Sequence, residues 1–152
     1  MIEVERVVRT SPREIFDVLG DGWSYAAWVV GASRIRAVDQ DFPQPGTRIH
    51  HSVGSWPVLL HDTTHVVSCV PNERIVLRAR GWPLGEADVE LHMEPLGNRA
   101  TKVRMLEDVS AGPGRLLPRP VRIAIIAPRN RETLRRLAYL AEHATHEDVG
   151  RR

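Results

Sequence analysis

The chain has 152 residues, of which 42% are apolar and 26% charged, and its formal net charge at pH 7 is +2. This length suits one domain and argues against separate cofactor and substrate domains, and no apolar run approaches the roughly 18 to 20 residues that a membrane span needs. The only cysteine, Cys69, excludes an intramolecular disulfide and a multi-cysteine zinc site. The first residues lack a signal-peptide pattern, so we expect a cytoplasmic protein.

The basic residues do not indicate a nucleic-acid partner. Twenty of the 21 cationic residues are Arg, and they are spread over the chain instead of forming a stripe. The one local excess runs from Arg115 to Arg136, where seven Arg accompany a single Glu132. This region is interpreted either as a solvated helix face or as a transient contact with an anionic membrane. The apolar residues that would join such a contact are Leu116, Leu117, Ile123, Ile125 and Ile126.

The chain begins with a predicted strand and two short helices. Residues 2–9 carry apolar side chains on one strand face. Ser11 is a helix cap, Pro12 suits the first helical position, and Glu14 completes a capping box. Residues 20–22 read Gly-Asp-Gly and end this helix near Leu19. A second short helix is then expected to carry Trp23, Tyr25 and Trp28.

Six strands are expected between residues 32 and 108. Turn sequences rich in Gly, Pro and Asn separate six β-like runs, and the connections are short enough for hairpins. Residues 87–94 alternate strictly between apolar and polar side chains. An antiparallel meander with one buried and one solvated face produces this pattern.

The period changes to that of a helix after residue 114. Leu134, Leu137, Ala138 and Ala141 form an amphipathic stripe that continues to about His146. Pro128 lies either at the first position of this helix or inside a longer helix that begins near Pro120. We expect one domain over residues 1–148 and a disordered tail over 149–152.

Four segments carry a resemblance to a known superfamily. They are WSYAAWVVG at 23–31, IRAVD at 35–39, PG at 45–46 before HHSVG at 50–54, and RNRETLRRL at 129–137. The chain resembles the helix-grip (SRPBCC) superfamily, which joins START lipid-binding domains, plant pathogenesis-related allergens and polyketide cyclases. It is most similar to small actinobacterial polyketide cyclase/dehydrase-like members. The resemblance implies an α+β fold with seven antiparallel strands in a curved sheet, two short helices after the first strand, a long C-terminal helix over the concave face, and a cavity between sheet and helix.

Polar residues on an apolar face are candidates for a site in that cavity, because burying them is unfavourable unless something pairs with them. His51 shares a strand face with Ile49 and Val53, and Glu107 shares one with Val103 and Met105. These two are the candidate acid–base residues. The alternatives are a core histidine with a satisfied hydrogen bond and a carboxylate paired with an Arg.

Two further polar residues are candidate ligand contacts. Asn130 lies one turn before Leu134 on the helix stripe, where it either orients a ligand or bonds to a strand carbonyl. Asp62 shares a strand face with Leu60, Thr64 and Val66, and His61 and His65 share the opposite face. Both faces are mixed, and the interpretation that Asp62 points inward is preferred.

The remaining expected ligand contacts are apolar or aromatic. Trp56 and Trp82 lie in proline-bearing turns, where they either rim a pocket entrance or pack within the turn. The other members of this group are Trp28, Met93, Met105 and Leu134.

No metal or cofactor is expected. His61 and His65 are four residues apart on a predicted strand, which separates them by about 13 Å, too far for one ion. Neither a nucleophile elbow nor a phosphate-binding loop is present.

The sequence therefore predicts a monomer or homodimer that binds a small hydrophobic ligand of aromatic or polyketide type. Cyclase- or dehydrase-type chemistry at His51 and Glu107 is an open extension, and peripheral lipid transfer through residues 115–136 is the alternative. Residues 111–128 are predicted to gate the cavity, because a Gly-Pro loop and Pro128 bound this segment.

Overall fold

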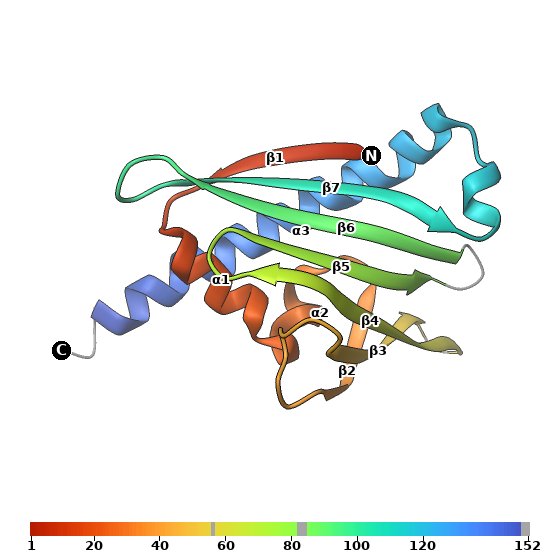
Figure 1. Cartoon of the computed structure of the whole chain (residues 1–152), viewed down its shortest axis with the longest axis horizontal. Coiled ribbons are helices and arrows are strands. Elements are labelled where there is room, and N and C mark those ends of the chain that lie inside the picture. Colours follow the sequence, from red (N-terminus) through yellow and green to blue (C-terminus); the bar gives the residue numbers. More distant parts are fainter. Residues whose placement is uncertain (56, 82–84, 150–152) are drawn as a thin grey trace.

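The computed structural model describes residues 1–55, 57–81 and 85–149. Within these ranges, seven strands, two short α-helices, two 3-10 turns and a long C-terminal helix follow one another in the expected order (Figure 1). The strands are β1 (Ile2–Val8), β2 (Ala32–Val38), β3 (Arg48–Ser55), β4 (Val58–Val70), β5 (Arg74–Gly81), β6 (Gly85–Pro95) and β7 (Thr101–Ala111). The helical elements are α1 (Pro12–Gly20), η1 (Gly22–Ser24), α2 (Tyr25–Trp28), η2 (Pro113–Leu116) and α3 (Arg119–Val149). Apart from Val149, which ends α3, the expected C-terminal tail lies outside the described residues.

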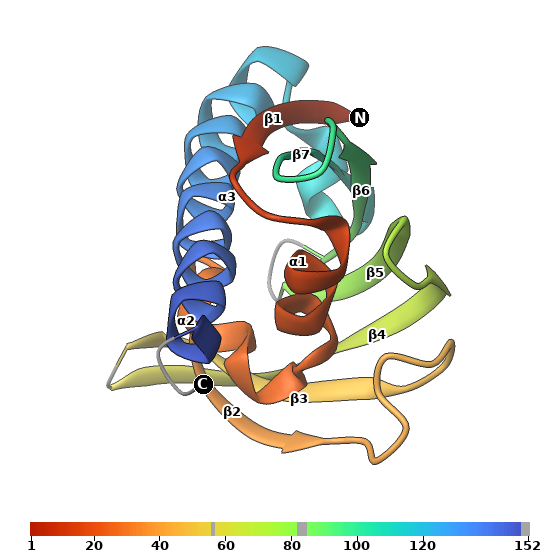
Figure 2. The same cartoon turned by 90° about the vertical axis from the view of Figure 1, so that its left-hand side faces the viewer.

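The seven strands form one antiparallel sheet in the order β1-β7-β6-β5-β4-β3-β2. Strands β2 to β7 are sequential neighbours, as short connections require, and β1 pairs with the far edge of β7. Figure 2 shows the sheet curving from β1 to β2 around α1 and α2, with α3 on the open side. The predicted α+β helix-grip architecture is therefore confirmed.

The start of α1 follows the predicted capping pattern. Ser11 Oγ accepts a hydrogen bond from the Glu14 backbone N–H, and the Glu14 side chain accepts one from the Ser11 backbone N–H. These two bonds satisfy donors that a helix N-terminus leaves unpaired. Ile15 and Leu19 place the apolar side of α1 in the core.

The helix α3 includes Pro128 in its interior, so the longer of the two predicted helices is present. Pro128 donates no backbone hydrogen bond, and an interior proline costs about 3 kcal/mol. The stripe after it is buried as predicted, with Leu134, Leu137, Ala138 and Ala141 each less than 4% exposed. Packing of this stripe against β1 and α1 accounts for a helix that continues through a proline.

Gly85 begins β6 with a backbone conformation that only glycine adopts readily. Its φ is +112°, and a Cβ atom there would lie 1.9 Å from the carbonyl oxygen of Ala111. The β6–β7 register shifts between Glu86 and Ala87 at the same place. This close approach of two strands brings the end of β7 and η2 against the start of β6.

Candidate ligand pocket

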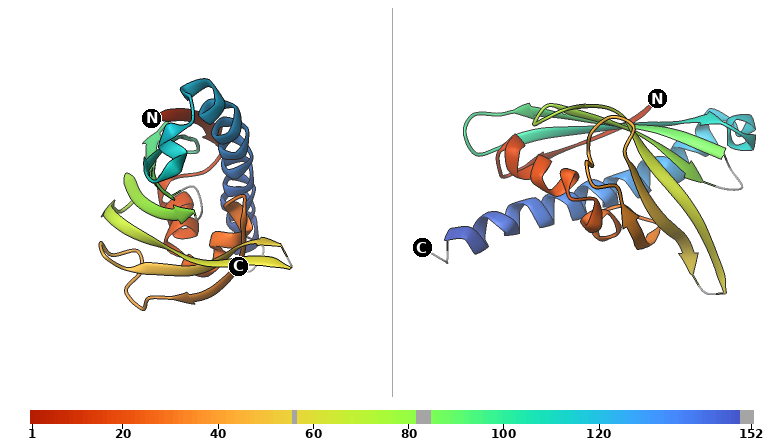
Figure 3. Two further views of the ribbon diagram at one scale, coloured as in Figure 1. Left: turned by 90° about the vertical axis from the view of Figure 1, so that its right-hand side faces the viewer. Right: turned by 60° about the horizontal axis from the view of Figure 1, so that its bottom comes forward.

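A pocket of about 290 Å³, here called the interior pocket, lies between the concave face of the sheet and the first turns of α3. Figure 3 shows η2 and the first turns of α3 beside the start of β6 and the end of β7. Residues of these four elements make up much of the pocket wall. Small and apolar side chains make up most of the lining, together with a few polar ones. The polar or charged lining residues are Tyr25, His51, Arg80, Glu86, Glu107, Arg122 and Arg129.

His51 lies on the pocket wall at the end of a row of buried hydrogen bonds. His51 Nε2 is 2.9 Å from Thr64 Oγ1, which is 3.4 Å from the Tyr25 hydroxyl. The rings of Tyr25 and His51 also stack, with centroids 5.7 Å apart. In the part of the chain that the structure describes, His51 Nδ1 has no hydrogen-bond partner. The histidine is thus held by one ring nitrogen, while the other nitrogen is buried and unpaired.

Burial determines the charge state of the His51 imidazole and the Tyr25 hydroxyl. It lowers the pKa of His51, and this effect outweighs the opposing influence of the nearby Asp62 carboxylate. Burial likewise raises the pKa of the Tyr25 hydroxyl. Both groups are therefore neutral at pH 7.

Glu107 faces the same pocket from β7 and is held by two residues of α3. One carboxylate oxygen pairs with the Arg129 guanidinium, and the other accepts a hydrogen bond from Asn130 Nδ2 at 2.8 Å. Glu107 and Asn130 are 4% and 1% exposed. The predicted alternative of a Glu–Arg pair is therefore present. Asn130 bonds the carboxylate, in place of the strand carbonyl or ligand that the sequence suggested.

Trp28 and Met105 line a smaller hollow of about 70 Å³ that adjoins the interior pocket. The two spaces share Tyr25, Val29, Val30, Ala79, Glu107 and Arg129. Trp28 is 2% exposed and packs edge-on against Tyr25. No hydrogen-bond partner for its Nε1 is present among the described residues.

Asp62 lies opposite His51 in the β3–β4 register and therefore on the inner strand phase, as preferred from the sequence. It is only half-buried and does not line the pocket. Its Oδ1 accepts a hydrogen bond from the backbone N–H of Thr63 at 2.8 Å.

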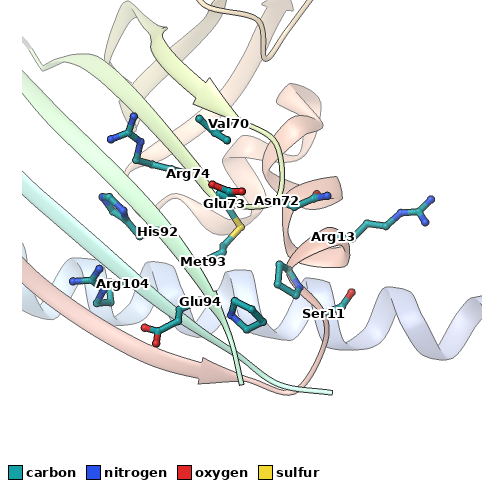
Figure 4. Close-up of a pocket in the computed structure, with 12 residues that line it drawn as sticks. Ser11, Arg13, Val70, Asn72, Glu73, Arg74, His92, Met93, Glu94 and Arg104 are labelled. Carbon is teal, nitrogen blue, oxygen red and sulfur yellow. The ribbon is translucent and has the colours of Figure 1, made fainter. Parts of the chain in front are cut away.

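Two predicted ligand contacts, Leu134 and Met93, lie away from the interior pocket. Leu134 is 1% exposed and packs in the core, because the helix stripe it belongs to faces β1 and α1. Met93 lies toward the opposite end of β6, where it lines a groove of about 860 Å³ (Figure 4). Two more predicted contacts, Trp56 and Trp82, fall outside the described residues.

The groove beside Met93 is larger than the interior pocket but has a different character. Arg74, His92 and Arg104 are cross-strand neighbours along its sheet side, and Glu73 and Glu94 add opposite charge (Figure 4). All five of these residues are exposed or half-buried. Because charged side chains line this open groove, whereas the interior pocket is lined mainly by apolar side chains, we assign the candidate site to the interior pocket.

Three residues of the site escaped sequence reasoning. Tyr25 and Arg129 lie inside the segments that carry the superfamily resemblance, and Thr64 shares the strand phase of Val66. A search for hydroxyl and cationic side chains on the same phases as His51 and Glu107 would have found Thr64. Arg129 belongs both to the segment at 129–137 and to the Arg excess of residues 115–136, and neither pattern indicates its pairing with Glu107.

Within the described ranges, no three His, Cys, Asp or Glu side chains gather as a metal site requires. No helix in the described part of the chain is both long and apolar enough to cross a bilayer.

Solved structures share this architecture. The Zhui aromatase/cyclase from a Streptomyces species is 14% identical, with a TM-score of 0.71 over 95% of this chain and 94% of that chain. A protein of unknown function from Staphylococcus aureus is 9% identical, with a TM-score of 0.71 over 95% and 94%. The di-domain aromatase/cyclase StfQ of the steffimycin biosynthetic pathway is 12% identical, with a TM-score of 0.68 over 95% of this chain and 52% of that one.

No protein-family model and no curated protein sequence matches the chain. At these identities the structural likeness establishes the fold alone. The superfamily resemblance seen in the sequence is confirmed at that level: the chain has the helix-grip fold that these two aromatase/cyclases also have.

Proposed function

We propose that the chain binds a small hydrophobic molecule, of aromatic or polyketide type, in the interior pocket. The observation that carries this proposal is an apolar space of about 290 Å³ with a few polar groups on its wall. Ligand pockets have this composition, and a cavity of about 150 Å³ is sufficient for benzene. The interior pocket therefore suits a ligand of about two fused rings.

The fold neighbours support the same ligand class. Two of them are aromatase/cyclases, one from the steffimycin biosynthetic pathway, and this supports an aromatic ligand. Because fold does not determine function, the proposal for this chain depends on its own pocket.

Of the two candidate acid–base residues, His51 is the better placed for cyclase- or dehydrase-type chemistry. It is neutral at pH 7 and lines the pocket, and its buried Nδ1 has no hydrogen-bond partner among the described residues. Glu107 has both carboxylate oxygens engaged by Arg129 and Asn130. We therefore propose that Glu107 positions Arg129 at the wall of the interior pocket by pairing with it.

The test is a calorimetric titration of the purified chain with 2-naphthol. Saturable binding at one site per chain is expected. The variant Ile125→Asp, at the half-exposed edge of the pocket, is expected to weaken binding, whereas Ile123→Asp, which does not line the pocket, leaves it unchanged. Absence of saturable binding in the wild type would refute the proposal.

Peripheral membrane binding is the second candidate, and the exposure of Leu116 favours it. Leu116 is 86% exposed in η2, and Val121, Ile123 and Ile125 are also exposed at the start of α3. The structure reduces the available charge, however. Four arginines of this region are paired with acidic side chains: Arg122, Arg129, Arg135 and Arg136. Ile126, one of the apolar residues expected at the membrane, is buried.

Co-sedimentation with vesicles tests this second candidate. Vesicles with an anionic lipid should retain the wild type and lose the variant Leu116→Asp if the membrane contact exists. Equal partition of both proteins into the supernatant would exclude it.

A further inference from the structure

Each described charged side chain on the wall of the interior pocket has an oppositely charged partner. On the strand side, Arg80 Nε lies 3.1 Å from Glu86 Oε1. On the helix side, Arg122 pairs with Asp108 and Arg129 pairs with Glu107. Among the described lining residues, no guanidinium and no carboxylate lacks such a partner.

The other titratable groups on the wall carry no charge at pH 7. Burial lowers the pKa of His51 and raises that of Tyr25. The three cations of the wall, Arg80, Arg122 and Arg129, are thus matched by Glu86, Asp108 and Glu107. Each guanidinium on the described wall therefore faces a carboxylate, and Asp108 also lies 3.8 Å from the N-terminal ammonium.

We infer that the interior pocket selects uncharged ligands, such as neutral phenols, ketones, esters and amides, and rejects carboxylates of the same shape. This inference rests on the proposed function and specifies its ligand class. A carboxylate that entered would lose its hydration without meeting a free cation. A neutral ligand of equal size gains the same apolar contacts without that penalty.

Glu107 is the residue that enforces this selection. A ligand carboxylate at Arg129 would have to share this guanidinium with Glu107, which is 4% exposed and already neutralises its charge. The substitution Glu107→Gln removes the competing charge and keeps an oxygen that can accept the Asn130 hydrogen bond. Arg129 then becomes an unpaired cation on the wall, and a carboxylate ligand becomes favourable.

The experiment compares 2-naphthamide with 2-naphthoate, two ligands of nearly equal shape that differ in charge at pH 7.5. Calorimetric titration of the wild type should give a dissociation constant at least about tenfold lower for the amide. In Glu107→Gln the preference should move toward the carboxylate by at least about tenfold. Glu132→Gln changes the net charge equally on an exposed part of α3 and should keep the wild-type ratio.

The double variant Glu107→Gln/Arg129→Gln has a neutral wall again and should again prefer the amide. If a thermal melt shows that the single variant does not fold, the ligand preferences of the wild type and the double variant still test the inference. If the wild type binds the carboxylate as tightly as the amide, the inference is wrong and the proposed function stands. If the wild type binds neither the amide nor the carboxylate, the inference and the proposed function are both wrong. Retention of carboxylate binding by the double variant would exclude Arg129 as the cause.

Discussion

Ala79 on β5 and Ala87 on β6 are direct cross-strand partners, and both line the interior pocket. Along the same face, the next pairs are Leu77 with Val89 and Ile75 with Leu91, and Ile75 and Leu91 are fully buried. Inward side chains therefore become smaller toward the pocket end of these two strands. The pocket exists because alanines stand where larger residues would fill the space between sheet and helix.

Substitution Ala87→Leu is therefore expected to fill the pocket from the sheet side. Ligand affinity should fall by at least about tenfold, while the melting temperature changes little, because the added atoms enter open space and avoid the roughly 1 to 3 kcal/mol strain typical of overpacking. Titration with 2-naphthol and a thermal melt measure both effects. The exposed Ala37→Leu serves as the control. Undiminished affinity in Ala87→Leu would place the ligand elsewhere.

Gly85→Ala should destabilise the protein by about 3 kcal/mol or more. The new Cβ would meet the Ala111 carbonyl oxygen at 1.9 Å, and the positive φ adds strain of about 1 kcal/mol or more. Gly97 also has a positive φ, of +68°, but nothing lies within 4 Å of its Cβ position. Gly97→Ala should therefore cost only about 1 kcal/mol. Urea unfolding compares the two, and equal losses would contradict the clash.

Asn130→Asp should destabilise the protein at neutral pH by about 3 to 5 kcal/mol, because it places a second carboxylate against Glu107 in a buried site. Acidification should restore part of the stability, since protonation of one carboxyl lets it donate to the other. Chemical unfolding at pH 7.5 and pH 5 measures the difference. Adding Glu107→Gln should rescue the variant at pH 7.5, because the Gln amide donates to the carboxylate introduced at position 130. Failure of this rescue would mean that the loss has another cause.

The lowered pKa of His51 predicts a definite pH dependence of stability. The unfolded chain protonates this imidazole near its ordinary pKa of 6.5, whereas the folded chain protonates it only at lower pH. Between these two values the unfolded state binds more protons, so the free energy of unfolding rises with pH. His51→Gln should lose this part of the slope. Asp62, Arg36 and His50 also act on this imidazole, and they remain in the variant. An unchanged slope would contradict a neutral, buried His51.

Residues 114–127 are expected to exchange amide hydrogens faster than residues 131–141, and ligand should slow the former. Gly114, Leu117, Arg122 and Ile125 line the pocket, and Pro128 interrupts the hydrogen bonds of α3 behind them. Opening the stripe of Leu134 and Leu137 would expose fully buried side chains, at about 1.5 to 3 kcal/mol each. Equal protection of both segments would mean that the pocket entrance does not lie at residues 114–127.

The fold followed from the sequence because periodic patterns and turn residues act locally. Alternation over residues 87–94 predicted β6, and Ser11 with Glu14 predicted the start of α1. Strand phase also placed His51, Glu107 and Asp62 on the inner face. Phase does not give position along a strand, and so Met93 was assigned to the same pocket as Met105 although it lies toward the other end of β6.

Partners across the sheet and helix were beyond sequence reasoning. The contact of Asn130 with Glu107 joins residues 23 apart, and that of His51 with Thr64 joins two strands. Such pairings depend on the register of β3 and β4 and on the rotation of α3 over the sheet. The register of a hairpin depends on the geometry of its turn, and the rotation of α3 depends on its packing against the sheet and α1.

The pairing of β1 with β7 has a consequence for how the protein folds. Ile2 pairs with Glu107, and the backbone N–H of Arg9 donates to the Glu142 side chain 133 residues away. The first strand therefore has neither its sheet neighbour nor its helix cover until β7 and α3 have been synthesised. Such long-range pairings give a high contact order and slow folding. During synthesis β1 keeps its apolar face without a partner until β7 is made, and a chain that stops before β7 cannot complete the sheet.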